Sequence, residues 1–131
     1  MKIAVDTNVL VRAVARDDSA QYEAAIAIMG RARTVAIAIP CLCELVWVLR
    51  SVYRFPLSEI SRAIRILIAA DNVETNRLAV EAGLAMLDAG GDFADGVIAY
   101  EGRWLGADMF VSFDGKAVEL LKSQGEQARE I

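Results

Sequence analysis

The sequence predicts an α/β fold, a three-layer sandwich in which a short central parallel sheet is flanked by helices. Short apolar segments of strand length alternate with longer segments of helical periodicity through the 131 residues. No hairpin signal joins two strand candidates, so consecutive strands must be connected through helices, which makes them parallel. The length and the lack of a linker or repeat predict one domain, residues 1–131.

Turn and cap residues divide the first half of the chain into elements. A short buried strand over residues 2–5 ends at Asp6, and a helical pattern follows from Asn8. Residues 17–19 (DDS) are typical of a helix start, before a helix over residues 20–29 that Gly30 closes. Four further elements are expected before residue 75: a strand over 35–39 ended by Pro40, helices over 40–53 and 58–70 separated by Pro56, and a brief strand over 73–74.

The second half begins with a helix over residues 76–89, which Gly90 and Gly91 separate from a helix over 92–105. A strand over 109–113 and a helix over 115–123 follow, and the polar tail to residue 131 either frays or adds an edge strand. In the helix over 92–105, one apolar stripe is predicted to face the core: Phe93, Val97, Tyr100 and Trp104.

Composition excludes several classes of protein. The hydrophobic fraction of 56% is enough for a core, yet no apolar run is long enough for a membrane span and none resembles a signal peptide. Cys41 and Cys43 are one residue apart in a predicted helix, so we expect no disulfide between them and a reducing, cytoplasmic location. The chain has no histidine, which excludes imidazole-dependent catalysis and most zinc sites.

The net charge of −4 argues against a basic surface that would hold nucleic acid by excess positive charge. It argues less against an enzyme that acts on nucleic acid. The 18 acidic residues exceed the 14 basic ones by four, so four carboxylates gathered around a metal ion would leave the other charges balanced.

Two aspartates each follow a short apolar strand, Asp6 after residues 3–5 and Asp114 after residues 109–113. The carboxyl ends of parallel strands face the ligand crevice of an open sheet, so these two side chains are candidates for one site. The alternative is a structural role, because aspartate also suits helix N-caps and turns.

Glu44 stands in an apolar helix, and the residues three and four positions away on either side are Pro40, Cys41, Trp47 and Val48. A carboxylate buried in such surroundings requires a partner, since an isolated buried charge is very unfavourable. A metal ion is one partner, and a buried ion pair with a distant arginine such as Arg103 is the other.

Asp92 and Asp95 are three residues apart at the start of a predicted helix, which places both near one face of its first turn. Asp92 fits an N-cap as well as it fits a functional site. Asp95 either belongs to the site or complements the helix dipole.

Together these acids predict a metal site. Clustered carboxylates repel one another, and a divalent cation relieves that repulsion. Hard oxygen ligands without histidine or thiolate favour Mg²⁺ or Mn²⁺. The chemistry that such a site most naturally performs is phosphodiester hydrolysis.

Four segments of the chain, in this order, resemble the PIN-domain ribonucleases and, within them, the VapC-type toxins of bacterial toxin–antitoxin pairs. The segments are residues 3–10 (IAVDTNVL), Glu44 in its apolar helix, residues 92–99 (DFADGVIA) and residues 111–114 (VSFD). The resemblance implies an RNA substrate and ligation of Mg²⁺ or Mn²⁺ by Asp6, Glu44, Asp95 and Asp114. It also implies supporting roles: Thr7 and Ser112 hold the carboxylates by hydrogen bonds, and Asn8 supports the first helical turn. Ser112 replaces the threonine that is more frequent there, and Gly96 replaces a residue that favours helix more.

The resemblance further implies a cognate antitoxin protein as partner, and the apolar helices over 40–53 and 58–70 suit a homodimer interface or an antitoxin contact. Trp47, Tyr53, Phe55, Ile60 and Ile64 offer the apolar surface for such an interface. One alternative is a non-catalytic PIN-like module that acts by binding a partner or RNA. Another is a phosphatase with Asp6 as nucleophile, which Asn8 disfavours because that chemistry needs a second acid nearby.

Overall fold

The computed structural model describes residues 1–131, which form seven helices and five strands. The chain folds as two compact units, Met1–Asn76 and Arg77–Ile131. None of the helices combines the length and the apolar character needed to cross a membrane.

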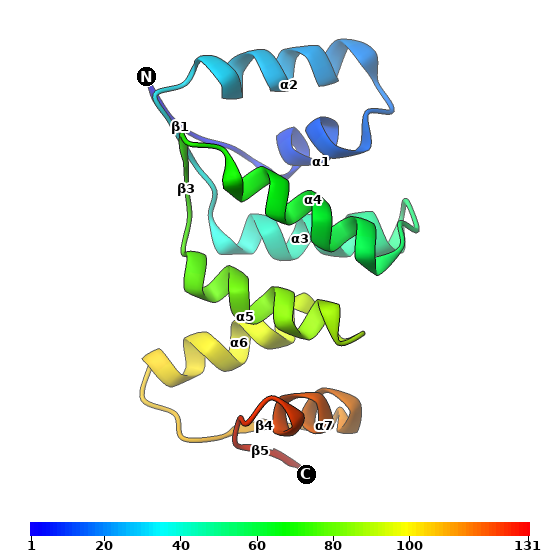
Figure 1. The fold of residues 1–131 in the computed structure, drawn as a ribbon, viewed down its shortest axis with the longest axis vertical. Coiled ribbons are helices and arrows are strands. Elements are labelled where there is room, and N and C mark those ends of the chain that lie inside the picture. Colours follow the sequence, from blue (N-terminus) through cyan, green and yellow to red (C-terminus); the bar gives the residue numbers. More distant parts are fainter. The chain divides into compact units, whose positions relative to one another are not determined.

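The first unit is built on a parallel sheet of three strands in the order β1-β2-β3. These strands are β1 (Lys2–Ala4), β2 (Thr34–Ala36) and β3 (Val73–Glu74). Val35 lies in register with Ile3 on one side and with Val73 on the other. Two helices connect β1 to β2 and two more connect β2 to β3 (Figure 1), as parallel strands require. The predicted parallel α/β architecture is confirmed.

The four helices of this unit are α1 (Thr7–Ala15), α2 (Ser19–Arg31), α3 (Ile39–Ser51) and α4 (Leu57–Ala69). Each begins within about two residues of its predicted start, because the sequence marks the starts chemically. Asp18 caps α2 by accepting a hydrogen bond from the Gln21 amide at 3.0 Å. Pro40 lies in the first turn of α3, where its missing amide hydrogen is not needed.

Burial in the first unit corrects two predictions. Ile60 and Ile64 are completely buried in the core and are not available to an interface, whereas Trp47 is 63% exposed and Tyr53 and Phe55 are partly exposed. The strand predicted at residues 2–5 is buried only in part. Val5 is buried and Ile3 is partly buried, whereas Lys2 and Ala4 are exposed, because side chains alternate between the two faces of a strand.

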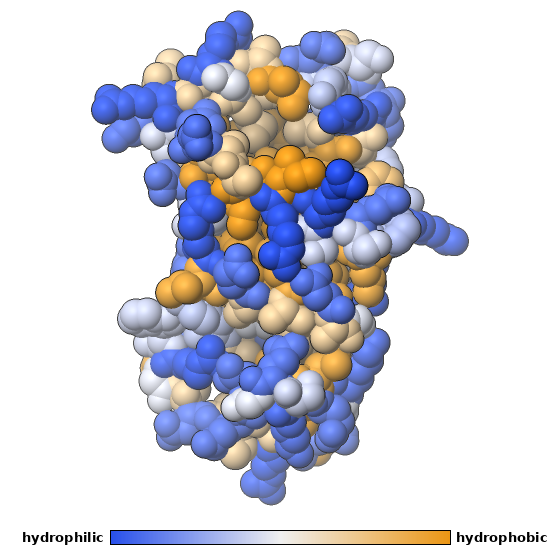
Figure 2. Space-filling view, in the orientation of Figure 1, coloured by the Kyte–Doolittle hydropathy of each residue, from blue (hydrophilic) through white to orange (hydrophobic).

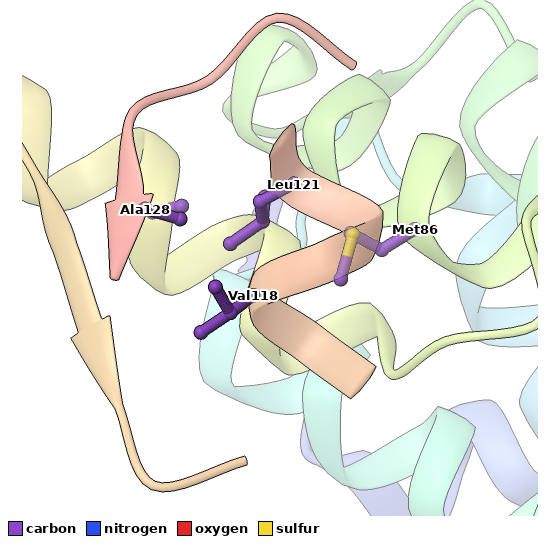
Figure 3. Close-up of a cluster of buried hydrophobic side chains, with 5 residues drawn as sticks. Met86, Val118, Leu121 and Ala128 are labelled. Carbon is purple, nitrogen blue, oxygen red and sulfur yellow. The ribbon is translucent and has the colours of Figure 1, made fainter. Parts of the chain in front are cut away.

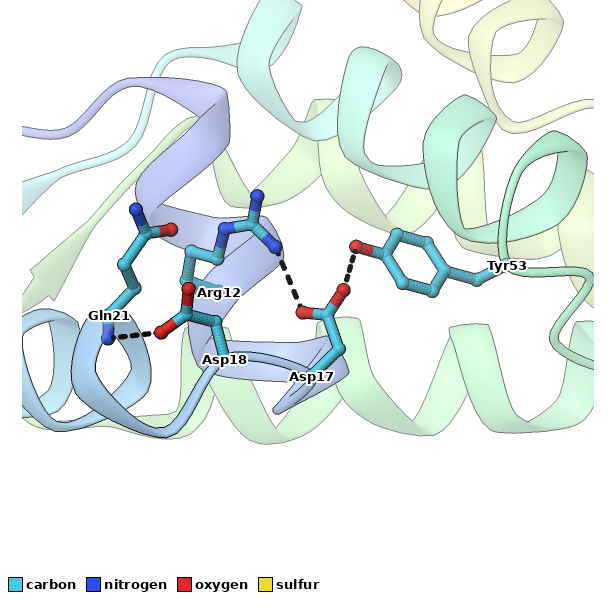
Figure 4. A network of polar contacts seen from close by, with 5 residues as sticks. All are labelled: Arg12, Asp17, Asp18, Gln21 and Tyr53. Carbon is cyan, nitrogen blue, oxygen red and sulfur yellow. Dashed lines mark hydrogen bonds and ion pairs between the residues drawn. The ribbon is translucent and has the colours of Figure 1, made fainter.

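A polar network on the surface fastens the connection between α1 and α2 to the segment that follows α3 (Figure 4). Asp17 is at its centre. It accepts a hydrogen bond from the Tyr53 hydroxyl at 2.7 Å and pairs with the Arg12 guanidinium at 2.9 Å. The Tyr53 hydrogen bond, with a smaller contribution from Arg12, lowers the pKa of Asp17 below its ordinary value of 3.8.

An open apolar hollow of about 390 Å³ lies between α1, α2 and α4. Its lining includes Ile26 and Ile66, which are 44% and 62% exposed. Figure 2 shows apolar side chains gathered on this surface between α2 and α4. Uncovered apolar surface of this kind is typical of binding sites.

The second unit contains α5 (Arg77–Asp88), α6 (Phe93–Trp104), β4 (Phe110–Ser112), α7 (Gly115–Ser123) and β5 (Ala128–Glu130). The polar tail forms β5, the second of the two outcomes predicted for it. β5 pairs in parallel with β4, so the strands of the chain are divided between two sheets and not gathered in one.

Two glycines allow α5 and α6 to pack closely side by side. A Cβ on Gly83 would stand 2.6 Å from Cε2 of Phe93, a ring that is fully buried. A Cβ on Gly96 would collide with the backbone carbonyl oxygen of Ala82. Gly96 therefore does more than loosen its helix. It lets the backbone of α6 approach the backbone of α5.

The core of the second unit includes a cluster of five buried residues: Met86, Ala99, Val118, Leu121 and Ala128. Figure 3 shows Val118 and Leu121 of α7 beside Ala128 of β5. The predicted core stripe of α6 is correct for Phe93 and Val97, but Trp104 is 74% exposed. Trp104 lies in the last turn of α6, where its indole donates a hydrogen bond to the Tyr100 hydroxyl at 2.6 Å.

Candidate active site

Asp6 stands where β1 ends and α1 begins, so one residue terminates the strand and caps the helix. Its Oδ1 accepts a hydrogen bond from the Thr7 amide at 2.7 Å. Its Oδ2 makes no hydrogen bond, and the side chain is exposed. The capping role suggested as an alternative is therefore real, but it occupies only one of the two carboxylate oxygens.

Glu44 is linked to Asp6 through Thr7. The buried hydroxyl of Thr7 donates a hydrogen bond to Glu44 Oε2 at 3.1 Å, while the Thr7 amide bonds to Asp6. One threonine thus holds a carboxylate from α3 beside the start of α1. The prediction that Thr7 holds a carboxylate by a hydrogen bond agrees with this geometry.

Glu44 is exposed, so the expectation that it is buried in an apolar helix was wrong. Leu42, Leu45 and Leu49 form the buried face of α3, and Glu44 is not part of that face. The alternative of a buried ion pair is wrong for the same reason, since it required Glu44 to be buried. The apolar neighbours of Glu44 in sequence surround it on the helix without covering it.

Asn8 is exposed in the first turn of α1, and its side chain forms no hydrogen bond. Cys41 makes a contact that the sequence did not indicate. Its Sγ donates a hydrogen bond to the Val5 carbonyl oxygen at 3.6 Å, which ties α3 to the residue before Asp6. Neither cysteine is part of a disulfide.

The second unit carries the other acids at the starts of two helices. Asp92 caps α6 through the Ala94 amide at 3.0 Å, as the sequence suggested, and Asp95 lies in the first turn. Asp114 caps α7 by accepting hydrogen bonds at Oδ1 from the Lys116 amide at 3.0 Å and the Ala117 amide at 3.2 Å. Its Oδ2 makes no hydrogen bond.

Ser112 orients Asp114 differently from the prediction. Its hydroxyl accepts a hydrogen bond from the Asp114 backbone amide at 2.9 Å and makes no bond to a carboxylate. The turn between β4 and α7 is therefore fixed at both ends, by Ser112 before Asp114 and by the amides of α7 after it.

Asp95 has an electrostatic environment unlike that of the other acids. Partial burial raises its pKa above the ordinary value of 3.8, and the negative charges of Asp92 and Asp114 raise it further. The three carboxylates of this unit are therefore close enough for their charges to interact. A raised pKa of this origin is typical of functional sites, and a cation would relieve the repulsion.

Comparison with known protein families matches residues 3–120 to the PIN domain. The chain belongs to the PIN domain family. The match spans both compact units and includes every candidate site residue. No curated protein matches the chain. PIN domains are generally nucleases and typically use divalent metal ions.

The candidate metal ligands of this PIN domain have the chemistry that a hard divalent ion requires. Every candidate ligand is a carboxylate, and Asp6 and Asp114 each keep one oxygen without a hydrogen bond. The structure has these acids in two groups, Asp6 with Glu44 in the first unit and Asp92, Asp95 and Asp114 in the second. Neither group has three side chains close enough together to hold a metal ion by themselves.

Proposed function

We propose that this PIN domain is a metal-dependent endoribonuclease that cleaves RNA phosphodiester bonds. The observation that carries the proposal is the environment of Asp95, a partly buried carboxylate whose pKa is raised by two neighbouring carboxylates. A structural acid gains nothing from such surroundings, whereas a metal ligand does. The family match adds that proteins with this domain are generally nucleases.

Four carboxylates are the proposed ligands of Mg²⁺ or Mn²⁺, directly or through water: Asp6, Glu44, Asp95 and Asp114. We infer that the chain acts as one domain in which both units supply ligands, because the family match runs through both. The bound ion would activate water and stabilise the leaving oxygen. Thr7 keeps Glu44 beside the start of α1, and Ser112 keeps Asp114 at the start of α7. Asp92 adds negative charge beside Asp95.

The test is cleavage of single-stranded and structured RNAs by the full chain with Mg²⁺, Mn²⁺ or EDTA. Asp6→Asn should abolish metal-dependent cleavage and keep the fold, since asparagine can still cap α1. Asp18→Asn is the matched control, because Asp18 also caps a helix but lies outside the proposed site. Equal activity of the two variants, or cleavage that persists in EDTA, would contradict the proposal. Hydrolysis of a phosphomonoester without RNA cleavage would favour the phosphatase.

A non-catalytic PIN-like binding module is the second candidate. It is favoured by one observation, that the acids of neither unit suffice for a metal site. This candidate predicts RNA or partner binding that neither metal nor Asp95→Asn changes. Metal-dependent cleavage that Asp95→Asn abolishes would exclude it.

The biological role that we propose is the toxin of a toxin–antitoxin pair, acting in the cytoplasm, where the two thiols outside any disulfide remain reduced. The hollow between α1, α2 and α4 offers an apolar surface for the antitoxin. Trp47 on α3 offers one for a homodimer. Growth arrest on expression of the wild-type chain, and not of Asp95→Asn, would support the toxin role. A monomer by light scattering at micromolar concentration would refute the dimer.

A further inference from the structure

The sheet formed by β4 and β5 packs one face against α7. Ala128 is buried in the cluster with Val118 and Leu121 of α7. Glu130, two residues further along β5, lies against the first residue of α7, because a Cβ on Gly115 would meet Glu130 Oε2 at 2.5 Å. Since side chains alternate along a strand, Arg129 between them points to the opposite face.

The same opposite face carries Val111, and Phe113 lies two residues further along the chain. Val111 is in register with Arg129, and paired residues of parallel strands share a face. The last pair of the two strands is Ser112 with Glu130, and it is closed by the hydrogen bond from the Ile131 amide to the Ser112 carbonyl oxygen at 3.1 Å. Phe113 follows directly, in the turn between β4 and α7. Val111 is 50% exposed and Phe113 is 82% exposed.

Phe113 is an exposed aromatic ring held on a well-fixed turn. It contacts no other aromatic ring and no cation in the structure. The residues on both sides of it are fixed by the hydrogen bond from the Asp114 amide to Ser112 and by the capping of α7. Arg129, on the face opposite α7, is exposed and forms no ion pair.

We propose that Phe113 and Arg129 form a nucleotide-binding surface of the proposed active site, on which a base of single-stranded RNA stacks against Phe113 and Arg129 pairs with a backbone phosphate. The inference rests on the proposed ribonuclease function, and it names two residues that hold the RNA. An exposed aromatic ring with an unpaired cation on the neighbouring strand is a combination that binds single strands, whose unpaired bases are free to stack. Phe113 directly precedes Asp114, so a stacked base would place its strand beside a proposed metal ligand.

The test measures binding of a short fluorescent oligouridine to the full chain in EDTA, and kcat and KM for its cleavage with Mg²⁺. Phe113→Leu should weaken binding about five-fold or more and raise KM with little change in kcat. Trp104→Leu is the matched control, since it also removes an exposed aromatic ring from the second unit. It should leave both quantities unchanged. Arg129→Gln should weaken binding and reduce its dependence on salt.

A set of oligonucleotides, each with an abasic site at a different position, separates stacking from a general loss of structure. For the oligonucleotide that lacks the base stacked on Phe113, wild type and Phe113→Leu should have equal affinity, because the base that distinguishes them is absent. Wild-type affinity and KM in Phe113→Leu, with RNA cleavage intact, would overturn this inference and leave the proposed function standing. Failure of the wild-type chain to cleave RNA with metal would instead overturn the proposed function, and this inference with it. An altered oligomeric state of Phe113→Leu with unchanged RNA affinity would also overturn the inference, since the face would then be a protein contact.

Discussion

Gly96→Ala is expected to destabilise the protein although alanine favours helix more than glycine does. The added methyl group would collide with the carbonyl oxygen of Ala82 and approach Cγ of Met86 to 2.9 Å. The carbonyl moves only if α5 moves, so the two helices must separate. Such overpacking costs about 1–3 kcal/mol. The gain in helix propensity offsets about 1 kcal/mol of it.

Gly102→Ala is the matched control, because Gly102 lies in the same helix and its added Cβ would meet only Cβ of Ala107, at 3.9 Å. It should raise the free energy of unfolding by up to about 1 kcal/mol. Urea denaturation of both variants isolates the helix contact, and the free energies of unfolding should differ by about 1–3 kcal/mol. Equal stability of the two variants would refute the close approach of α5 and α6 at Gly96, and with it the position of Asp95 on α6.

Three further predictions concern the acids. Glu44→Gln should abolish cleavage and change the free energy of unfolding by less than about 0.5 kcal/mol, because Glu44 is exposed and glutamine still accepts the Thr7 hydrogen bond. A loss of several kcal/mol, measured by thermal unfolding in the presence of a chelator, would argue for a structural role. Asp92→Ala should lower the free energy of unfolding by about 1 kcal/mol, because it removes the cap of α6, and it should reduce activity in part. It should also lower the pKa of Asp95, as measured by NMR. Asp95→Asn should abolish activity, and equal catalytic losses in the two variants would make Asp92 a ligand. In EDTA, the raised pKa of Asp95 makes its contribution to stability increase as pH falls through that pKa toward 3.8, and the lowered pKa of Asp17 makes its contribution decline below 3.8, so melting temperature should pass through a maximum. Tyr53→Phe should shift this maximum downward in pH, because it removes the largest cause of the lowered Asp17 pKa and so weakens the loss of stability in acid. A curve that falls steadily from neutral pH would contradict the Asp95 environment.

Much of the fold follows from local signals in the sequence. Asp18, Pro40 and Pro56 mark helix starts, and the helix over 115–123 was predicted with its observed bounds. The pairing of the strands was less predictable. The apolar pattern that identifies β4 does not say which strand becomes its neighbour, and β5 is too polar to be told from a fraying tail.

The site was predictable in its residues but not in its contacts. The positions of Asp6 and Asp114 after short apolar strands, and the spacing of Asp92 and Asp95, are visible in the sequence. The exposure of Glu44 is not, because apolar neighbours along a helix do not reveal which face is covered. The closeness of Gly96 to the carbonyl of Ala82 and the Cys41 contact with Val5 also depend on tertiary packing, so composition and periodicity give no signal for them.

The central claim is that acids from both units bind the same metal ions, and Mn²⁺ titration followed by electron paramagnetic resonance tests it most directly. Wild type, Glu44→Gln from the first unit, Asp95→Asn from the second and the double variant would be compared. We expect each single variant to weaken Mn²⁺ binding at least about ten-fold. The Mn²⁺ affinity of the double variant should be little lower than that of the weaker-binding single variant, because both substitutions damage the same site. Wild-type Mn²⁺ affinity in Glu44→Gln, with binding lost only in Asp95→Asn, would contradict a site shared by the two units.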